Sequence, residues 1–242
     1  MGSGGIGASN ANRGSGIPGK KIIVDSSSLI TISDNCIMKI VKNVAELEKI
    51  SFIIPESVYI ESVENPLHIR RYELNAIRIR DAVAEGYLKV VTSTSATREW
   101  MERLIKGTAT MVRSNGKQLR LLQWGETETL GLLKELNSKI LLIDERTTRM
   151  LIENPAGLAS ILSRRHGREV TLDREKMKWF LANFADTKII RSVELIALAY
   201  EDGAMHSELH KSKQALEAAL YAAKFSGCAV SEAEIQEYLR KA

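Results

Sequence analysis

Hydrophobic positions along the chain alternate between short apolar runs and longer stretches with a helical period. The apolar runs, rich in Ile and Val, predict strands at residues 20–25, 51–55, 87–93, 138–144 and 187–192. Helical patterns cover residues 35–48, 56–64, 69–85, 95–112, 125–137, 145–153, 193–202, 207–226 and 231–241. Strands that lack polar alternation are usually covered on both faces. The pattern therefore predicts an α/β fold, with a central parallel sheet sandwiched by helices and a C-terminal helical extension.

Three segments differ in composition and pattern. Residues 1–19 are rich in Gly, Ser and Asn, which indicates a disordered leader or an expression scar. Residues 20–192 are expected to form one α/β domain, and residues 193–242 are expected to form helices packed on the same domain. Two matches to G-x-G-x-x-G fall in the leader, where no predicted strand precedes them, so they do not indicate dinucleotide binding.

Composition narrows the class of protein. The 34 Lys and Arg residues slightly exceed the 30 Asp and Glu residues, and the net charge of +4 permits a nucleic-acid partner without requiring one. No apolar run approaches the roughly 20 residues that span a bilayer, and no secretory signal pattern opens the chain. We therefore expect a cytoplasmic protein with no membrane partner. Cys36 and Cys228 form no C-x-x-C motif, so the sequence contains no zinc framework.

Acidic residues lie at or near the ends of several predicted strands. Asp25 ends the run "KIIVD" and Asp144 ends the run "KILLID". Glu61 lies on the helix after the second strand, and Glu126 lies on the helix before the fourth. The carboxyl ends of parallel strands meet at one edge, where ligands of α/β sheets bind. For a single aspartate a helix N-cap is the simpler interpretation, and this alternative stays open for Asp25.

Several carboxylates at one edge of a sheet need a neutralising partner. Like charges at close range repel and raise one another's pKa, so such a cluster persists mainly when a cation binds it. Ligation by oxygen atoms alone favours Mg²⁺ or Mn²⁺ over zinc. Hard divalent cations held by carboxylates are typical of sites that hydrolyse phosphodiesters. The acids therefore indicate metal-dependent phosphodiester chemistry.

The order of four motifs, "IIVDSSSLI", "IPESVYIESV", "GETETLGLLKEL" and "ILLIDERTTRML", resembles that of the PIN (PilT N-terminus) domain. This family of metal-dependent ribonucleases includes the toxins of many prokaryotic toxin-antitoxin pairs. The resemblance covers about residues 21–153 and resumes at "KIIRSVELIALAYEDGAM". It implies strand order 3-2-1-4-5, divalent-metal-dependent endoribonuclease activity on an RNA substrate, frequent homodimerisation and an antitoxin as candidate partner. The stretch 154–187 is a longer insertion than the family usually carries.

The resemblance also implies roles for individual residues. It assigns catalysis and metal binding to four acids, which are Asp25, Glu61, Glu126 and Asp144. Ser27 matches the position that supports the metal and its water, and Glu64, one turn from Glu61, is the alternative second acid. The rival function is a catalytically inactive PIN-like module that binds RNA or a protein. An aspartyl phosphatase would need D-x-D after the first strand, where this chain has D-S-S.

Helical geometry predicts where several side chains point. Each residue turns a helix by roughly 100°, so Glu126 shares the apolar face of its helix, whereas Glu128 and Glu135 fall on the side expected to face solvent. Glu145 is expected to open the next helix, where an acid suits the N-terminal dipole. Within the insertion, apolar residues recur at helical spacing and predict an amphipathic helix: Met177, Phe180, Leu181 and Phe184. The tryptophans are interpreted as core or interface anchors: Trp100, Trp124 and Trp179.

Overall fold

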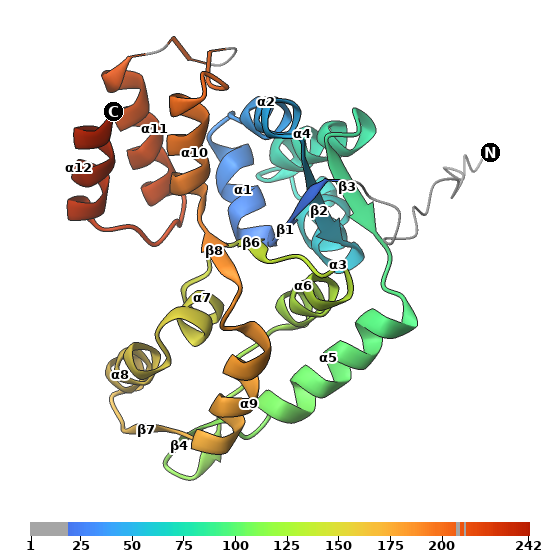
Figure 1. Ribbon diagram of the computed structural model, residues 1–242, viewed down its shortest axis with the longest axis vertical. Helices are drawn as coiled ribbons and strands as arrows, with labels where there is room; N and C mark the ends of the chain where they lie inside the picture. Colours follow the sequence, from blue (N-terminus) through green and yellow to red (C-terminus); the bar gives the residue numbers. More distant parts are fainter. Residues whose placement is uncertain (1–18, 207–208, 211) are drawn as a thin grey trace.

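The computed structural model describes residues 19–206, 209–210 and 212–242. A five-stranded parallel sheet crosses the molecule, and helices cover both of its faces (Figure 1). The strands lie in the order β3 (Leu88–Val91), β2 (Ile50–Pro55), β1 (Lys20–Val24), β6 (Ile140–Leu142) and β8 (Lys188–Ile190). Numbered along the chain, these strands have the order 3-2-1-4-5. The predicted α/β class with a central parallel sheet is confirmed.

Successive residues of the central strands face opposite sides of the sheet, and both sides are apolar. In β1, Ile22 and Val24 pack into one hydrophobic core, whereas Ile23 packs into a second core on the other face. Strand β2 alternates in the same way. Because both faces are covered, the strands carry continuous apolar runs, which is the pattern that made them recognisable in the sequence.

One face of the sheet is covered by helices from the two ends of the chain. They are α1 (Ser26–Asp34), α2 (Lys39–Glu48), α4 (Glu73–Ala84), α10 (Ser192–Glu201), α11 (Lys213–Phe225) and α12 (Glu232–Lys241). Leu195 of α10, Leu216 of α11 and Ile235 of α12 belong to the same hydrophobic core as Ile22. The C-terminal helices therefore share a core with the first strands.

The other face is covered by the middle of the chain. Its helices are α5 (Ser95–Thr108), α6 (Trp124–Glu135), α7 (Arg146–Glu153), α8 (Pro155–His166) and α9 (Arg174–Phe184). A small antiparallel sheet joins them, in the order β5 (Lys117–Gln118), β4 (Val112–Ser114) and β7 (Val170–Leu172). The insertion at 154–187 thus supplies α8, β7 and α9, which extend the second core.

The amphipathic helix predicted within the insertion is confirmed as α9. Phe180 and Phe184 are fully buried and stack with ring centroids 4.8 Å apart. A glycine lets α5 approach this helix closely, because a Cβ at Gly107 would lie 2.3 Å from the ring of Trp179. The apolar side of α9 therefore packs against the domain to which the insertion belongs.

The sequence pattern predicted α2 but missed the helix before it. Helix α1 begins at Ser26, directly after β1, whereas the first predicted helix, at residues 35–48, corresponds to α2. Its sequence "SSSLITISD" is rich in serine and β-branched residues, which have modest helix propensity. Tertiary burial of Leu29 and Ile32 and an N-cap by Asp25 stabilise it instead.

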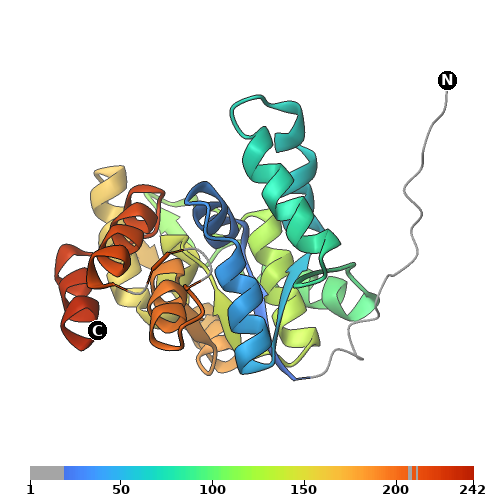
Figure 2. The ribbon, with the colours of Figure 1, turned by 90° about the horizontal axis from the view of Figure 1, so that it is seen from above.

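Helical segments after β2 project from the rest of the molecule. They comprise α3 (Glu56–Tyr59), the π-helix η2 (Ile60–Glu64), the 3₁₀ helix η3 (Pro66–His68) and α4. Figure 2 shows this part (teal) extending beyond the neighbouring helices. A π-helical turn is rare and often lies at a functional site. Here it carries both Glu61 and the alternative acid Glu64.

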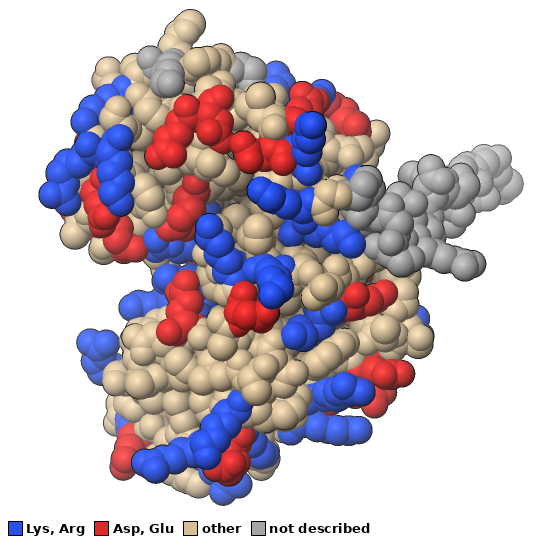
Figure 3. Space-filling view, in the orientation of Figure 1, with Lys and Arg blue, Asp and Glu red and all other residues tan. Residues whose placement is uncertain are grey.

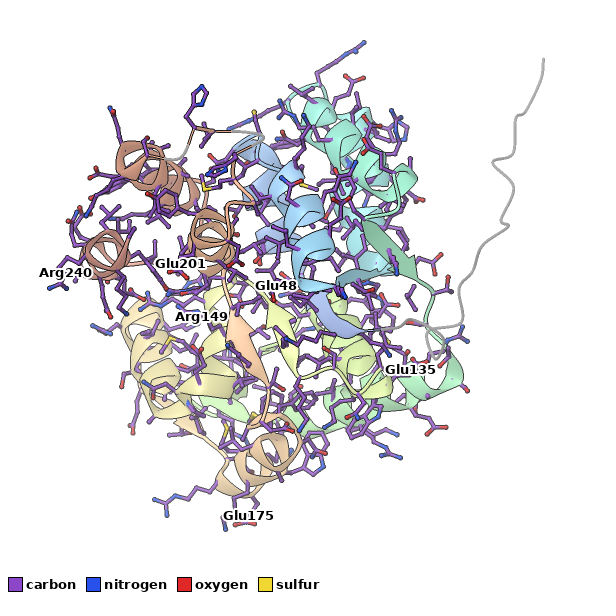
Figure 4. All side chains as sticks on the ribbon, turned by 45° about the horizontal axis from the view of Figure 1, so that its top comes forward. Glu48, Glu135, Arg149, Glu175, Glu201 and Arg240 are labelled. Carbon is purple, nitrogen blue, oxygen red and sulfur yellow. The ribbon has the colours of Figure 1, made fainter. Side chains whose placement is uncertain are left out.

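Two arginines attach the C-terminal helices to the sheet domain. Arg191, at the start of α10, forms ion pairs with Glu194 and with Glu234 of α12, and its Nη1 donates to Ala229 O at 2.8 Å. Arg149 of α7 lies between α7 and the C-terminal helices (Figure 4), and its Nη2 donates to the same carbonyl at 3.4 Å. Arginines from helices on opposite faces of the sheet, Arg149 of α7 and Arg191 of α10, thus both bind the loop before α12.

The surface shows mixed charge on the side seen in Figure 1. Lysine and arginine side chains alternate there with aspartate and glutamate side chains (Figure 3). That face therefore carries no extended field of one sign. Among the described residues, no helix combines the length and the apolar character needed to cross a membrane.

Candidate active site

Asp25 lies at the carboxyl edge of the sheet, immediately after β1, and is 3% exposed. Its Oδ2 accepts hydrogen bonds from Ser27 N at 3.0 Å and from Ser27 Oγ at 2.7 Å. Asp25 is therefore the N-cap of α1, and the capping alternative is confirmed. These bonds use one carboxylate oxygen, so capping does not exclude a second role.

Ser27 connects the ends of two neighbouring strands. While its hydroxyl donates to Asp25, its oxygen accepts from Asp144 N and Glu145 N, each at 3.1 Å. The serine thereby holds the end of β1 against the segment that follows β6. Its contacts position the acids, and its predicted role in supporting a metal and water stays a prediction.

Two carboxyl groups at this edge, those of Asp25 and Glu126, have raised pKa values. Burial raises the pKa of Asp25 from its ordinary 3.8 to about 6, with Ser27 opposing the shift and Glu61 and Glu145 adding to it. Burial likewise raises the pKa of Glu126 from 4.5 to about 7, opposed by its bond to a backbone N–H, with Glu145 and Asp25 adding to the shift. Carboxyl groups from four separate segments are thus close enough to repel one another.

The charge of Glu61, and not that of Glu64, adds to the raised pKa of Asp25. Glu64 instead helps to raise the pKa of Tyr59, after burial. The start of α6 approaches Glu61 closely, since a Cβ at Gly125 would lie 3.2 Å from Glu61 Oε2. A glycine immediately before Glu126 therefore allows the first turn of α6 to lie against the carboxylate of Glu61.

Asp144 reaches the same edge, and its carboxylate binds the start of α10. It is 2% exposed and accepts from Ser192 N at 2.8 Å and Ser192 Oγ at 2.5 Å. After burial, Asp144 is the main cause of the raised pKa of the Cys228 thiol. Asp144 thus fastens the start of α10 to the end of β6, and its assigned role in metal binding stays a prediction.

Glu145 is the acid that sequence reasoning did not include in the site. It caps α7 as predicted, because its carboxylate accepts from Thr147 N at 2.8 Å and Thr148 N at 2.7 Å. It also raises the pKa of both Asp25 and Glu126. The sequence did contain a signal for Glu145, because two acids, Asp144 and Glu145, are adjacent after β6. Successive side chains point in different directions, so either of the two could have faced Asp25.

The predicted exposure of Glu128 and Glu135 was wrong. Glu128 is 5% exposed and accepts from Ser57 N at 3.0 Å and from Ser93 Oγ. Glu135 (Figure 4) is half-buried, and its carboxylate accepts from Thr94 and Thr97 at the start of α5. Helix α6 is enclosed between the sheet and α5, so the side of α6 that faces away from the sheet contacts α5. The prediction had assumed that this side faces solvent.

Glu128→Ala is expected to lower the free energy of unfolding by about 2–3 kcal/mol. The substitution leaves a buried backbone N–H of α3 without its acceptor and removes a link to the loop before α5. Urea unfolding measures the effect. Glu153→Ala, at an exposed acid at the end of α7, serves as the control and should change stability by less than about 0.5 kcal/mol. Equal stability of the two variants would contradict the bridging role.

The donor atoms at this edge suit a hard cation. The interacting side chains are carboxylates, and the nearby hydroxyl of Thr148 is buried without a hydrogen bond of ordinary geometry. In the described part of the chain, no group of three or more acidic, histidine or cysteine side chains is arranged as a ready-made metal site. Two of the carboxylates, Glu126 and Glu145, are turned toward backbone N–H groups that they cap.

Two comparisons with known proteins were made, with protein-family models and with curated proteins. No protein-family model matches the chain, and a search of curated proteins found no significant match. The resemblance to PIN domains therefore depends on the motifs and on the agreement of the strand order. Homodimerisation and an antitoxin partner stay predictions of that resemblance.

Proposed function

We propose that the protein is an endoribonuclease that hydrolyses RNA phosphodiester bonds with Mg²⁺ or Mn²⁺ bound at the carboxyl edge of the sheet. The observation that carries the proposal is that carboxyl groups from four elements converge on this edge, where repulsion by Glu145 adds to the raised pKa values of buried Asp25 and Glu126, and repulsion by Glu61 adds to that of Asp25. Such repulsion is unfavourable in a metal-free protein and is relieved when a cation binds.

The donor set supports this choice of cation. Carboxylates and hydroxyls are ligands of Mg²⁺ and Mn²⁺, whereas zinc sites in proteins usually include histidine or cysteine. The four carboxylates would hold the cation, with Glu145 in place of the originally assigned Asp144. When bound, the metal would supply an activated water and stabilise the developing charge on the phosphate.

The residues of the chain have separate tasks in this proposal. Ser27 orients Asp25 and, through two backbone N–H groups, the segment that carries Glu145. Gly125 allows Glu126 and Glu61 to come from different helices to the same place. With a pKa of about 7, Glu126 is partly protonated at neutral pH without a cation, whereas Asp25, with a pKa of about 6, is mostly ionised, so cation binding should release a proton mainly from Glu126.

Two glutamates of the same π-helix provide the test. With a labelled RNA, cleavage by the full chain should need Mg²⁺ or Mn²⁺ and stop with EDTA. Glu61→Gln should reduce cleavage by more than about 100-fold, which exceeds the usual cost of losing an outer-shell partner. Glu64→Gln, an exposed acid three residues away with no effect on Asp25, is the matched control and should cleave normally.

The rival is a PIN-like module that binds RNA or protein without cutting. It is favoured by the lack of a ready-made metal site among the described residues. The rival would be established if the wild-type chain bound RNA but did not cleave it in Mg²⁺ or Mn²⁺, and if Glu61→Gln behaved in the same way. This result would exclude the nuclease. Calorimetry with Mn²⁺ alone adds a second readout, because Glu61→Gln should weaken metal binding and Glu64→Gln should not.

A further inference from the structure

A pocket of about 420 Å³ lies between the end of α5 and the segment that leads into α6. Its apolar wall includes Ile105, Leu121, Leu122 and the ring of Trp124. Gln118 and Arg120 contribute polar groups, and the described residues that line the pocket include no carboxylate. The volume lies in the range of small-molecule sites, which combine apolar walls with a few polar groups.

Two residues that line this pocket, Trp124 and Thr127, belong to α6, the helix that carries Glu126. Trp124 is the first residue of α6, two residues before Glu126, and it is 58% exposed. Of the two expected positions, core or interface, this exposure excludes the core for Trp124 and leaves the interface open. Trp100, by contrast, is half-buried, and its ring has Arg103 and Lys134 at 5.2 and 5.4 Å from its centroid. The exposed indole of Trp124 presents a large, flat apolar face that a ligand can cover.

The polar groups of the pocket suit a nucleotide. Arg120 is held at the pocket because its Nε donates to Leu122 O at 3.0 Å. Among the described residues, no ion pair involves Arg120, so its charge is available to a phosphate. The exposed amide of Gln118 offers both a donor and an acceptor to the edge of a base.

Charge distinguishes this pocket from the one on the other side of Trp124. That second pocket is lined by Glu56, Glu102 and Glu128, with Arg98 as the compensating cation. Three carboxylates would repel the backbone of a nucleic acid. A polyanion that lies against Trp124 would therefore favour the side of Arg120.

We propose that the Trp124 pocket binds an unpaired nucleobase of single-stranded RNA, by stacking on the indole ring beside Arg120. The proposal deepens the proposed function, since it names the substrate class of that site and rests on it. Trp124 and Glu126 leave different sides of α6 but lie within its first turn, so a strand whose base is held at the pocket lies within one helical turn of Glu126. Bases within a duplex are stacked on one another and do not present a free face, which selects single strands.

Binding measured in EDTA tests the proposal without any need for cleavage. Fluorescence anisotropy of a labelled short single-stranded RNA reports affinity for the full chain. Trp124→Ala should weaken binding by about tenfold, the effect typical of losing one base–aromatic stack, and Trp124→Phe should restore most of it. Phe225→Ala removes an 81% exposed aromatic residue of α11 and is the matched control, with unchanged affinity expected.

Two further probes separate stacking from charge. An abasic strand of equal length and charge should bind wild-type protein and Trp124→Ala equally, and RNA duplex should show no dependence on Trp124. Equal affinity of Trp124→Ala and wild type for the single strand, or no binding of the single strand at all, would overturn the proposal. If Glu61→Gln loses cleavage but still binds RNA in a Trp124-dependent manner, both the nuclease and the base-binding pocket are supported. Trp124-dependent binding by a wild-type chain that never cleaves supports this proposal and contradicts only the nuclease.

Discussion

Asp25→Asn should abolish metal-dependent cleavage and, in EDTA at neutral pH, make the protein more stable. Removing the charge removes a ligand, so we expect cleavage to fall by more than about 100-fold. The same change relieves a buried charge that Glu61 and Glu145 repel. Asparagine caps helices about as well as aspartate, so α1 should be retained. Thermal unfolding in EDTA and cleavage in Mn²⁺ measure the two effects.

The pH dependence of that stability gain follows from the direction of the shift. The pKa of Asp25 is raised from 3.8 in the unfolded chain to about 6 in the folded protein. The contribution of this carboxyl to stability is therefore fully present below pH 3.8 and is lost as the pH rises through 6. Above that pH, Asp25→Asn should be more stable than wild type by about 1–3 kcal/mol, and below pH 3.8 the two should agree.

Two controls make this prediction specific. Addition of Mn²⁺ should stabilise wild type more than Asp25→Asn, because only the intact set of carboxylates binds the cation well. Glu64→Gln should follow wild type under all conditions. A variant that is less stable than wild type at pH 8, or that still cleaves in Mn²⁺, would contradict the placement of Asp25 at a metal site.

Asp144 and Glu145 are adjacent, yet their substitutions should have opposite consequences. Asp144→Ala leaves Ser192 N and Ser192 Oγ without an acceptor in a buried position, so we expect a loss of about 2–4 kcal/mol in the free energy of unfolding. Glu145→Gln retains one capping oxygen and should cost less than about 1 kcal/mol. It should nevertheless lower cleavage by more than about tenfold.

Asp144→Asn is the matched variant for this pair. Its side-chain oxygen can still accept from Ser192 N, so it should fold and cleave at a rate closer to wild type than Glu145→Gln does. Chemical unfolding and RNA cleavage, measured on the same preparations, separate the two roles. An inactive but stable Asp144→Asn together with an active Glu145→Gln would return the metal-binding role to Asp144, as the sequence resemblance assigned it.

Local patterns in the sequence were sufficient for the strands of the central sheet, for the parallel arrangement and for helix α9. Each of these depends on a period of apolar residues within one segment, such as Met177, Phe180 and Phe184 of α9. The capping role of Glu145 was equally local, because a helix N-terminus needs acceptors within three residues. Proximity of Asp25, Glu61 and Glu126 followed from the fold class, since parallel strands end at one edge.

Long-range packing decided the features that the sequence pattern missed or misplaced. Helix α1 forms from residues of modest helix propensity because the fold buries Leu29 and Ile32. Glu128 is buried because α5, from a distant part of the sequence, covers the outer side of α6.

The direction of each acidic side chain was decided in the same way. Asp144 turns toward Ser192, which is 48 residues away along the chain, whereas its neighbour Glu145 caps α7 and lies close enough to Asp25 to raise the pKa of Asp25. A helical or strand period states which side of an element is apolar, but it contains no information on which other element will cover the opposite side. The covering element is known only when segments far apart in the sequence have packed together, and this packing determines which partner each carboxylate of this protein contacts.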